Sequence, residues 1–248
     1  MNSDTDIKKF KILNSTNHFA LALIRDKKPA EGTVVVAEEQ TEGKGLDGNI
    51  WDSEPGKNLT FSVIIYPDFL DPSNQFYLNI ITSLAVRDAL KQCLPEEKIC
   101  IKWPNDIYHG DKKISGILIK NQISGVTLQS SIIGVGININ QEKFDASVPN
   151  PVSVKMITGN DYDSAVCLQS FRRYFDSYYR QLAAGKYDAL MSEYIGCMYL
   201  FGQKSAFTIM GHKEEGKIVG VDEFGRLLIE TKDSLIPCQM KEVVFPKN

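Results

Sequence analysis

One short stretch of this chain carries side chains that bind anions and metal ions: residues 102–116 read KWPNDIYHGDKKISG. Pro104 fixes its own φ and favours an extended residue before it, so the backbone turns a rigid corner there. Asn105 and Asp106 follow that corner directly and offer amide and carboxylate oxygens. The stretch is too polar at its centre for a protein core. It predicts a site for a phosphate-bearing or carboxylate-bearing ligand, with or without a metal ion.

The same stretch predicts a β-hairpin. The tight-turn sequence His109-Gly110-Asp111 separates two apolar segments. Lys113 stands just past this turn, on the arm opposite to Asn105 and Asp106. A lysine on a strand is usually a solvated surface charge, so its place in a site depends on the motif around it.

A second candidate ligand loop follows an apolar strand: residues 41–51 read TEGKGLDGNIW. Its three glycines expose backbone NH groups and Lys44 adds a positive charge, which suits a phosphate or a carboxylate. Trp51 closes the loop, which we expect to be mobile. The pattern matches neither GxxxxGK[ST] nor GxGxxG, so by itself it does not distinguish a ligand loop from a plain turn.

A glycine-bearing strand comes later. Residues 132–140 alternate with period two, which places Gly134, Gly136 and Asn138 on one face. Glycines weaken a strand interior unless something lies close against them. Two explanations stay open: a flat ligand resting on the glycines with Asn138 at its edge, or a sheet packed closely on a helix. The loop 141–154 that follows is long enough to be a lid.

Composition narrows the function classes. The 248 residues are 43% hydrophobic and 24% charged, typical of a soluble globular protein with a full core. A net charge of -3 argues against a general nucleic-acid binder. Five cysteines without a CxxC pair indicate reduced thiols in a cytosolic protein, and three isolated histidines argue against a histidine-based metal site. Residues 1–11 lack an apolar signal core, and no run is long enough to span a membrane.

Hydrophobic periodicity predicts the elements that position these motifs. Ser15 or Thr16 is expected to cap a helix and, alternatively, to bind a polar ligand there. Further helices are predicted over residues 71–90, 163–184 and 187–195, and strands over residues 10–13, 33–37, 59–66, 99–103, 114–119 and 128–140. From Met198 onward the pattern changes to five short strands, over residues 206–210, 217–221, 227–231, 235–238 and 243–245. These predict a small β-barrel.

Four motifs in this order resemble those of the biotin protein ligases (biotin–[acetyl-CoA-carboxylase] ligases): Ser15-Thr16-Asn17, Gln40 to Gly45, KWPND with Lys113, and Gly134 to Asn138. The resemblance runs from about Ser15 to the C-terminus. It implies an α+β fold, with a mixed sheet and flanking helices like those of class II aminoacyl-tRNA synthetases, and a C-terminal SH3-like barrel. The expected domains are a catalytic domain over 1–198 and the barrel over 199–248.

The resemblance also implies an activity. Members make biotinyl-5′-AMP from biotin and MgATP, then pass biotin to a lysine of a biotin carboxyl carrier protein in the cytoplasm; some form homodimers. Matching positions make Lys113 and Lys44 the expected catalytic residues and Asp106 the expected Mg²⁺ ligand. The expected biotin contacts are Ser15, Thr16, Asn17, Gln40, Gly43, Lys44, Gly45, Leu46, Lys113, Gly116 and Gly134. The expected ATP contacts are Lys44, Trp51, Asn105, Asp106, Lys113 and Asn138.

The sequence departs from the family pattern in places. Leu46 and Asn49 stand where the glycine-rich loop commonly has arginines, and Lys120 stands where an acidic residue is usual. The arginine at the position of Leu46 helps to retain the adenylate. Its absence implies either release of biotinyl-AMP or compensation by another cation or by the loop backbone.

Three alternatives compete with this reading. A lipoate–protein ligase of the same superfamily is disfavoured by the intact KWPND and glycine-loop order. A catalytically dead, biotin-sensing binder is disfavoured because Lys44 and Lys113 are both retained. A biotin-responsive repressor would carry a winged helix-turn-helix, and only 14 residues precede Ser15, so we expect a monofunctional ligase that does not bind DNA.

Overall fold

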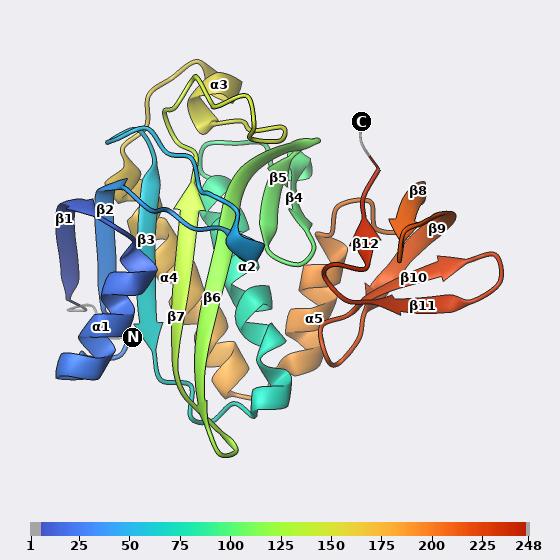
Figure 1. Cartoon of the computed structure of the whole chain (residues 1–248), viewed down its shortest axis with the longest axis horizontal. Coiled ribbons are helices and arrows are strands. Elements are labelled where there is room, and N and C mark those ends of the chain that lie inside the picture. Colours follow the sequence, from blue (N-terminus) through green and yellow to red (C-terminus); the bar gives the residue numbers. More distant parts are fainter. Residues whose placement is uncertain (1–5, 247–248) are drawn as a thin grey trace.

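The computed structural model describes residues 6–246; residues 1–5, the start of the polar N-terminal stretch, and residues 247–248 lie outside the described residues. A seven-stranded mixed sheet forms the larger part of the molecule and a five-stranded antiparallel sheet forms the smaller part (Figure 1). The larger sheet has the order β1-β2-β3-β7-β6-β5-β4, with β1 and β2 parallel and the other neighbours antiparallel. The predicted α+β class is confirmed.

The strands of the larger sheet are β1 (Ile7–Leu13), β2 (Val34–Gln40), β3 (Leu59–Ile65), β4 (Ile99–Lys102), β5 (Asp106–His109), β6 (Lys112–Ser124) and β7 (Thr127–Ile137). The α-helices are α1 (Thr16–Lys27), α2 (Phe76–Leu90), α3 (Val154–Thr158), α4 (Ser164–Ala183) and α5 (Tyr187–Gly196). Short 3₁₀ helices lie at Leu46–Gly48, Pro72–Asn74 and Glu96–Lys98.

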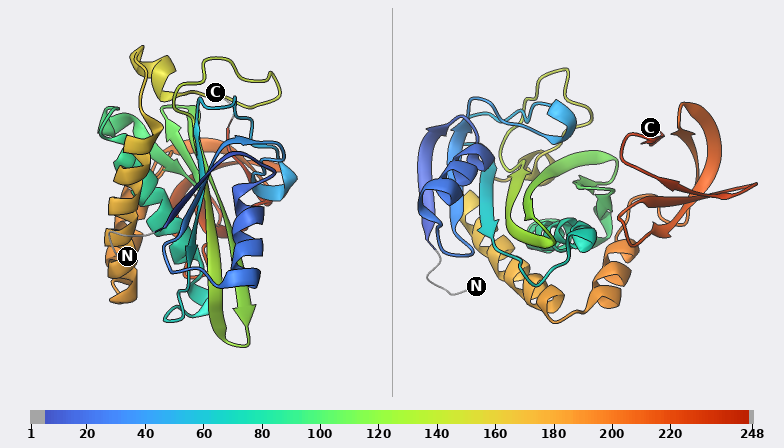
Figure 2. Two further views of the ribbon diagram at one scale, coloured as in Figure 1. Left: turned by 90° about the vertical axis from the view of Figure 1, so that its left-hand side faces the viewer. Right: turned by 60° about the horizontal axis from the view of Figure 1, so that its bottom comes forward.

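Helices cover the larger sheet on both faces (Figure 2). On one face α1 packs through Ala20 onto a small cluster with Val35, Ile64 and Ile132. On the other face α2 and α4 pack on the sheet and on each other, and with α5 they enclose the main hydrophobic core. All seven residues of β3 are therefore buried, as its continuous apolar run predicts.

Several elements differ from the predicted ones. The predicted helix over 71–90 is split, because Asp71 caps a 3₁₀ turn by accepting a hydrogen bond from Ser73 N at 2.8 Å. Strand β6 extends to Ser124, beyond the predicted end at residue 119, and the chain reverses at Gly125, whose φ is +59°. Helix α3 was not predicted; Ser153 caps it by accepting from Met156 N.

The smaller sheet consists of β8 (Lys204–Ile209), β9 (His212–Val221), β10 (Leu227–Thr231), β11 (Leu235–Cys238) and β12 (Val243–Val244), in the order β11-β10-β9-β8-β12. The five predicted strands are thus confirmed. Backbone and side-chain hydrogen bonds join the region of this sheet to the larger one. Ile101 of β4 exchanges backbone hydrogen bonds with Cys197 (2.8 Å) and Tyr199 (2.9 Å), and Trp103 Nε1 donates to Gly225 O at 2.9 Å.

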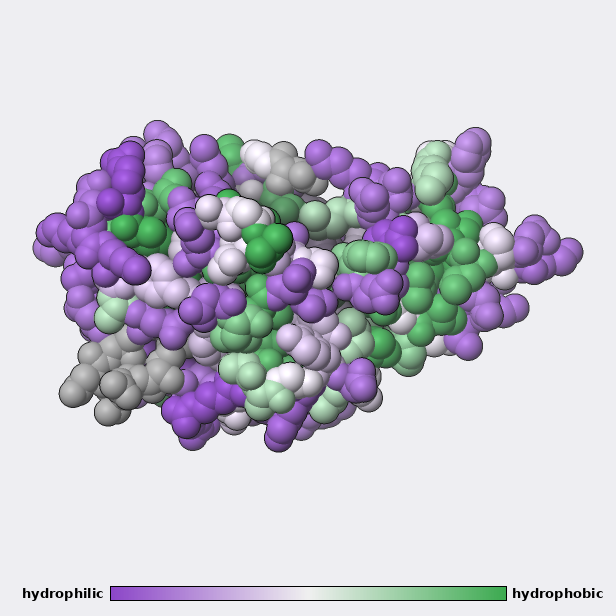
Figure 3. Space-filling model, turned by 90° about the horizontal axis from the view of Figure 1, so that it is seen from below, coloured by the Kyte–Doolittle hydropathy of each residue, from purple (hydrophilic) through white to green (hydrophobic). Residues whose placement is uncertain are grey.

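Seen from below, the molecule has hydrophobic surface gathered over the C-terminal sheet (Figure 3). In the described part of the chain, no helix is both long and apolar enough to cross a membrane.

Candidate active site

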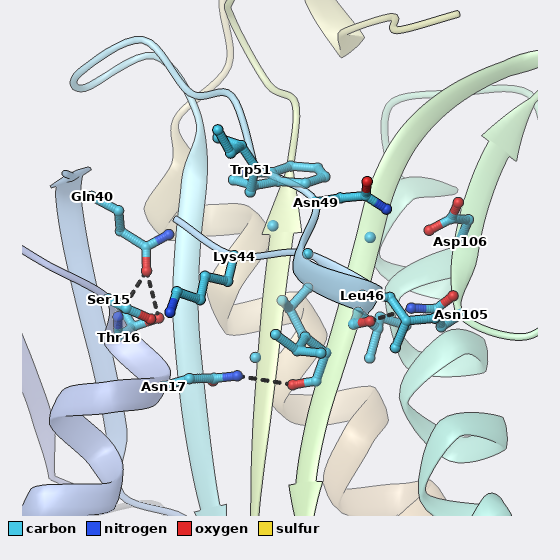
Figure 4. Close-up of a pocket in the computed structure, with 18 of the residues that line it drawn as sticks. Ser15, Thr16, Asn17, Gln40, Lys44, Leu46, Asn49, Trp51, Asn105 and Asp106 are labelled. Atoms are coloured by element: carbon cyan, nitrogen blue, oxygen red, sulfur yellow. Dashed lines mark hydrogen bonds between the residues drawn. The ribbon is translucent and has the colours of Figure 1, made fainter. Parts of the chain in front are cut away.

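A cavity of about 250 Å³ lies on the α1 face of the larger sheet (Figure 4). Its floor is the sheet, one wall is the start of α1, and its roof is the glycine-rich loop. Most of the predicted site residues line it: Ser15, Thr16, Asn17, Gln40, Lys44, Gly45, Leu46, Trp51, Asn105, Asp106, Lys113, Gly116 and Gly134. Gly43 and Asn138 are not among the lining residues, and Gly136, which was predicted to share a face with Gly134, is.

The register of the paired strands places the residues of the cavity floor side by side. Asp106 pairs with Gly116, which pairs with Gly136, which pairs with Thr60, so these four residues form one row across β5, β6, β7 and β3. Leu118, Gly134 and Ser62 form the next row of the same face. The small residues at the centre of both rows leave room above the sheet.

The start of α1 forms a polar wall. Ser15 holds the N-cap position but makes no side-chain capping bond, so the predicted capping role of its hydroxyl is wrong. Gln40 Oε1 instead accepts hydrogen bonds from Thr16 N (2.7 Å) and Thr16 Oγ1 (3.1 Å). Asn17 Nδ2 donates to Leu118 O at 3.0 Å. These contacts fix amide and hydroxyl groups at the cavity edge.

Ser62 supports the cavity lining through Thr16 and Asn17, and the sequence did not predict this role. Its buried hydroxyl lies 2.8 Å from Thr16 Oγ1 and 2.6 Å from Asn17 Oδ1, and thereby ties α1 to the floor. Ser62 was not singled out because it lies within the largely apolar run 59–66. Thr60 and Ser62 are hydroxyl residues two apart in that run, which is the signal that could have identified this face.

The glycine-rich loop forms the roof of the cavity. Gly45 N donates to Asn49 O at 2.7 Å and Trp51 N donates to Gly43 O at 3.0 Å, so the loop closes on itself as a small hairpin. The expectation that the glycines expose bare NH groups is therefore wrong for Gly45. Lys44 points from this roof toward the start of α1 (Figure 4). Gly43 is packed so closely that an added Cβ would lie 2.9 Å from Trp51 O.

Two different side chains pack against the two strand glycines. A Cβ added at Gly136 would overlap the Trp51 indole ring, and one added at Gly134 would overlap the Asn17 amide. Packing against a helix thus explains Gly134, whereas Gly136 faces an aromatic ring from the loop. Trp51 Nε1 is buried and has no hydrogen-bond partner, so a donor is available beside the cavity.

Lys113 and Asp106 meet at the far side of the cavity. Lys113 Nζ lies 2.7 Å from Asp106 Oδ1 and 5.8 Å from the centroid of the Trp51 ring. Within the described residues, no group of three or more histidine, cysteine or acidic side chains is placed to hold a metal ion. One carboxylate fits Mg²⁺ that takes its other ligands from phosphates and water, which is the usual pattern for MgATP.

The two asparagines of the predicted nucleotide site, Asn105 and Asn138, differ in whether they line the cavity. Asn105 lines the cavity, and its Nδ2 donates to Ile117 O. Asn138 is buried, and its Nδ2 donates to Val152 O at 3.1 Å, which ties it to the loop after β7. Asn138 Oδ1 has no partner, so Asn138 offers a buried acceptor.

The loop predicted as a lid is attached at both ends. Gln141 donates to Asp52 at 3.1 Å and accepts from Glu54 N at 2.9 Å. Near the other end, Lys113 N donates to Asn150 O at 2.7 Å, and Val152 N donates to Lys113 O at 2.9 Å. Movement of a lid would therefore be confined to the residues between these attachments.

Lys102 belongs to the KWPND motif but not to the cavity lining. Its Nζ donates to Tyr108 Oη at 3.1 Å and lies 4.8 Å and 4.9 Å from the ring centroids of Tyr108 and Phe245. Burial lowers the pKa of this ammonium below its ordinary value. Lys102 therefore connects the hairpin to the C-terminal sheet region.

Comparisons with known proteins found matches to both parts of the chain. A sequence model of the Biotin/lipoate A/B protein ligase family matches residues 9–138, and one of the Biotin protein ligase C terminal domain matches residues 210–244. The bifunctional ligase/repressor BirA of Bacillus subtilis is 30% identical over 230 residues, 90% of this chain and 69% of that protein. The biotin–[acetyl-CoA-carboxylase] ligase of Paracoccus denitrificans is 26% identical over 79% of this chain and 82% of that protein. A solved structure, the biotin protein ligase from Aquifex aeolicus in complex with biotin and ATP, matches with a TM-score of 0.81 and 26% identity over 98% of this chain and 99% of that chain.

Proposed function

The chain belongs to the biotin/lipoate A/B protein ligase family, and from this premise we propose that it attaches biotin to a lysine of a biotin carboxyl carrier protein through biotinyl-5′-AMP. The proposal rests on one observation: the polar residues at the start of α1, Lys44 and Lys113 all line the same cavity. Such a cavity suits a small ligand with a polar ring and a carboxylate.

The polar wall suits the ureido ring of biotin. A ureido group has two NH donors and one carbonyl acceptor. Ser15, Thr16 and Gln40 supply hydroxyl and amide groups of both kinds at one end of the cavity. Fixed polar groups of this sort orient a small ligand at little entropic cost.

The first step joins two anions. A biotin carboxylate oxygen attacks the α-phosphorus of ATP, the bond from that phosphorus to the bridging oxygen breaks, and pyrophosphate leaves. The Lys113 and Lys44 ammonium groups then offset the negative charge on the phosphate oxygens. Mg²⁺ bound with ATP would add charge neutralisation beside Asp106. No protein nucleophile is needed, so positioning and electrostatics supply the rate.

The second step is acyl transfer. The neutral amine of the acceptor lysine attacks the biotinyl carbonyl carbon, the bond from that carbon to the AMP oxygen breaks, and the amine loses a proton to solvent. AMP leaves as an anion, which the same two lysines can stabilise. Lys113 must release Asp106 in part to do this, since its ammonium pairs with that carboxylate at 2.7 Å.

Transfer of [¹⁴C]biotin to a purified carrier domain, with and without ATP, tests the proposal. We expect ATP-dependent label on the carrier lysine, and no label on a carrier in which that lysine is replaced. [¹⁴C]Lipoate in a parallel reaction tests the lipoate alternative. Absence of ATP-dependent biotin incorporation would reject the ligase function, and preferential lipoate transfer would replace biotin by lipoate.

We also infer a cytoplasmic location, where carrier proteins of carboxylases and ATP are available. The five cysteines are all free thiols in the structure, which is in keeping with a reducing compartment.

A further inference from the structure

Gln141 has a buried side-chain amide at the start of the loop after β7, and it does not line the cavity of the candidate active site. Its exposed fraction is 2%, so the polar atoms of the amide need partners within the protein. Its Oε1 accepts from Glu54 N at 2.9 Å and from Asn58 Nδ2. Its Nε2 donates to Asp52 Oδ2 at 3.1 Å and to Lys143 O at 2.8 Å. Both donors and both acceptor positions of the amide are therefore used.

The pairing of β3 with β7 explains why Gln141 reaches this place. The two strands are neighbours in the sheet, and their chains stay side by side beyond it. Ile139 N donates to Asn58 Oδ1 at 3.0 Å, and Asn140 N donates to Lys57 O at 2.8 Å. The next residue of the chain is therefore brought to the segment that ends the glycine-rich loop.

Gln141 holds the segment 52–54, which directly follows Trp51. On the other side, Trp51 N donates to Gly43 O at 3.0 Å. The Trp51 ring lies above the sheet, so close to Gly136 that a Cβ added there would overlap it (Figure 4). Among the described residues, Trp51 Nε1 has no hydrogen-bond partner. Since the ring makes no hydrogen bond of its own, its place over the cavity depends on the backbone that these contacts hold.

We propose that Gln141 is a positioning residue for the nucleotide: through Asp52 and the backbone of Glu54, it holds the Trp51 ring where that ring contacts ATP. This inference rests on the proposed function, in which Trp51 is an expected ATP contact. The polar wall for biotin is held by other hydrogen bonds, from Thr16 to Gln40. Loss of the Gln141 contacts should therefore weaken the binding of ATP more than that of biotin.

Gln141→Glu tests this role with almost no change of shape. The variant replaces the two NH donors by a carboxylate oxygen, which would face the Asp52 carboxylate and the Lys143 carbonyl and be repelled by both. In biotin-dependent ATP–pyrophosphate exchange, KM for ATP should rise by about tenfold, while Kd for biotin should stay within about twofold of wild type. Tryptophan fluorescence without substrates should also change, because the Trp51 ring moves. An unchanged KM for ATP would contradict the proposal.

A complementary replacement shows whether the contact with Asp52 is the cause. In the double variant Gln141→Glu/Asp52→Asn, the new amide at position 52 can donate to the new carboxylate, so the hydrogen bond returns with its direction reversed. KM for ATP should then fall back to within about threefold of wild type, and the fluorescence should recover. Asp52→Asn alone should have little effect, since an amide oxygen can still accept from Gln141. A double variant as impaired as Gln141→Glu would overturn the proposal.

Asn140→Asp is the matched control, because it makes the same change from amide to carboxylate at the neighbouring residue. The Asn140 side chain bonds to the backbone of Tyr162, by donating to O at 2.8 Å and accepting from N at 3.0 Å. This variant should lower the thermal midpoint and leave KM for ATP and the tryptophan fluorescence unchanged. Equal increases of KM in Asn140→Asp and Gln141→Glu would reveal a general loss of stability and count against a positioning role.

Asp52→Ala covers the case in which a carboxylate at position 141 prevents folding. Asp52 is half-buried, and its removal takes away one contact of Gln141 without opening the core. KM for ATP should rise by about threefold, and an unchanged KM would contradict the proposal. Loss of exchange in the wild type would instead reject the proposed function. The fluorescence measurement needs no activity, so it would still decide whether Gln141 holds the Trp51 ring.

Discussion

Lys113 connects the two halves of the candidate site through both its side chain and its backbone. Its ammonium pairs with Asp106, while its backbone NH and carbonyl bond to Asn150 and Val152 of the loop after β7. The hairpin motif predicted that Lys113 lies on the arm opposite to Asp106, whereas the backbone contacts depend on a loop that returns from about forty residues later and has no local signal.

Replacement of Lys113 by alanine should abolish most adenylation and leave the fold intact. An ammonium that offsets charge on the reacting phosphate is worth a factor of about 10² to 10³ in rate. The partly exposed ion pair with Asp106 contributes about 1 kcal/mol or less to stability. Biotin-dependent ATP–pyrophosphate exchange and thermal unfolding measure the two effects. The neighbouring exposed Lys112→Ala is the control, and a near-normal exchange rate in Lys113→Ala would remove this lysine from the mechanism.

Leu46 lies where an arginine is expected from the family pattern, and it lines the cavity of the candidate active site. An arginine introduced here would bring a guanidinium close to the adenylate phosphate, and charge-assisted hydrogen bonds are about twice as strong as neutral ones. Leu46→Arg should therefore slow release of biotinyl-AMP by about tenfold, measured by stopped-flow or filter binding. Leu46→Met keeps the volume without the charge and should not change it. No slowing in the arginine variant would refute the idea that the native enzyme releases its adenylate readily.

At the scale of elements, the register of β7 against β3 and β6 builds the cavity floor. Gly136 and Gly116 are paired, and both lie under the Trp51 ring. The ring can lie flat on the sheet only because neither position carries a side chain.

Gly136→Ala tests this arrangement. The added methyl group overlaps the indole, so Trp51 must move, and overpacking of this kind costs about 1–3 kcal/mol. We expect a lower denaturation midpoint, altered tryptophan fluorescence and a higher KM for ATP. Gly196→Ala, with no atom within 4 Å of the added Cβ, is the matched control and should be neutral or slightly stabilising. Wild-type fluorescence and KM in Gly136→Ala would show that Trp51 does not use this surface.

Elements with strong local signals could be predicted, and contacts between distant segments could not. The hairpin turn at Gly110, the long helix α4 and the five C-terminal strands follow from turn residues and periodicity. The glycines of the 41–51 loop were expected to expose their backbone NH groups, because local sequence does not reveal that Gly45 and Trp51 bond back within the loop. Ser62 and the overlap of Trp51 with Gly136 depend on strand register, which is set by the whole sheet.

At the scale of the whole molecule, Trp103 links the hairpin that carries Lys113 to the C-terminal sheet. Its indole NH bonds to Gly225 O, and Gly225 lies so close to Phe76 of α2 that no side chain fits there. The three segments come from positions far apart in the chain. The predicted domain boundary at residue 198 stays a prediction. Residues on either side of it form backbone hydrogen bonds with β4.

Trp103→Phe should loosen this junction. The ring volume is largely kept, but a buried carbonyl loses its donor, which costs about 1–3 kcal/mol. We expect a lower thermal midpoint and faster proteolysis within residues 199–246, with the larger sheet cleaved later. Tyr199→Phe, which removes the exposed hydrogen bond of 2.8 Å from Tyr199 Oη to Asp111, should have a smaller effect. Equal proteolysis rates in wild type and Trp103→Phe would show that the indole bond does not hold the two sheets together.

Lys113 forms two backbone hydrogen bonds with the loop after β7, and these bonds make the opening of that loop measurable. The amide protons of Lys113 and Val152 are protected only while residues 150–152 lie against the start of β6. Their exchange with deuterium therefore follows the opening of that loop, and ligands that hold it down should slow both protons together. The timing of loop closure could thus be read at the backbone of the lysine that is proposed to act on the phosphate.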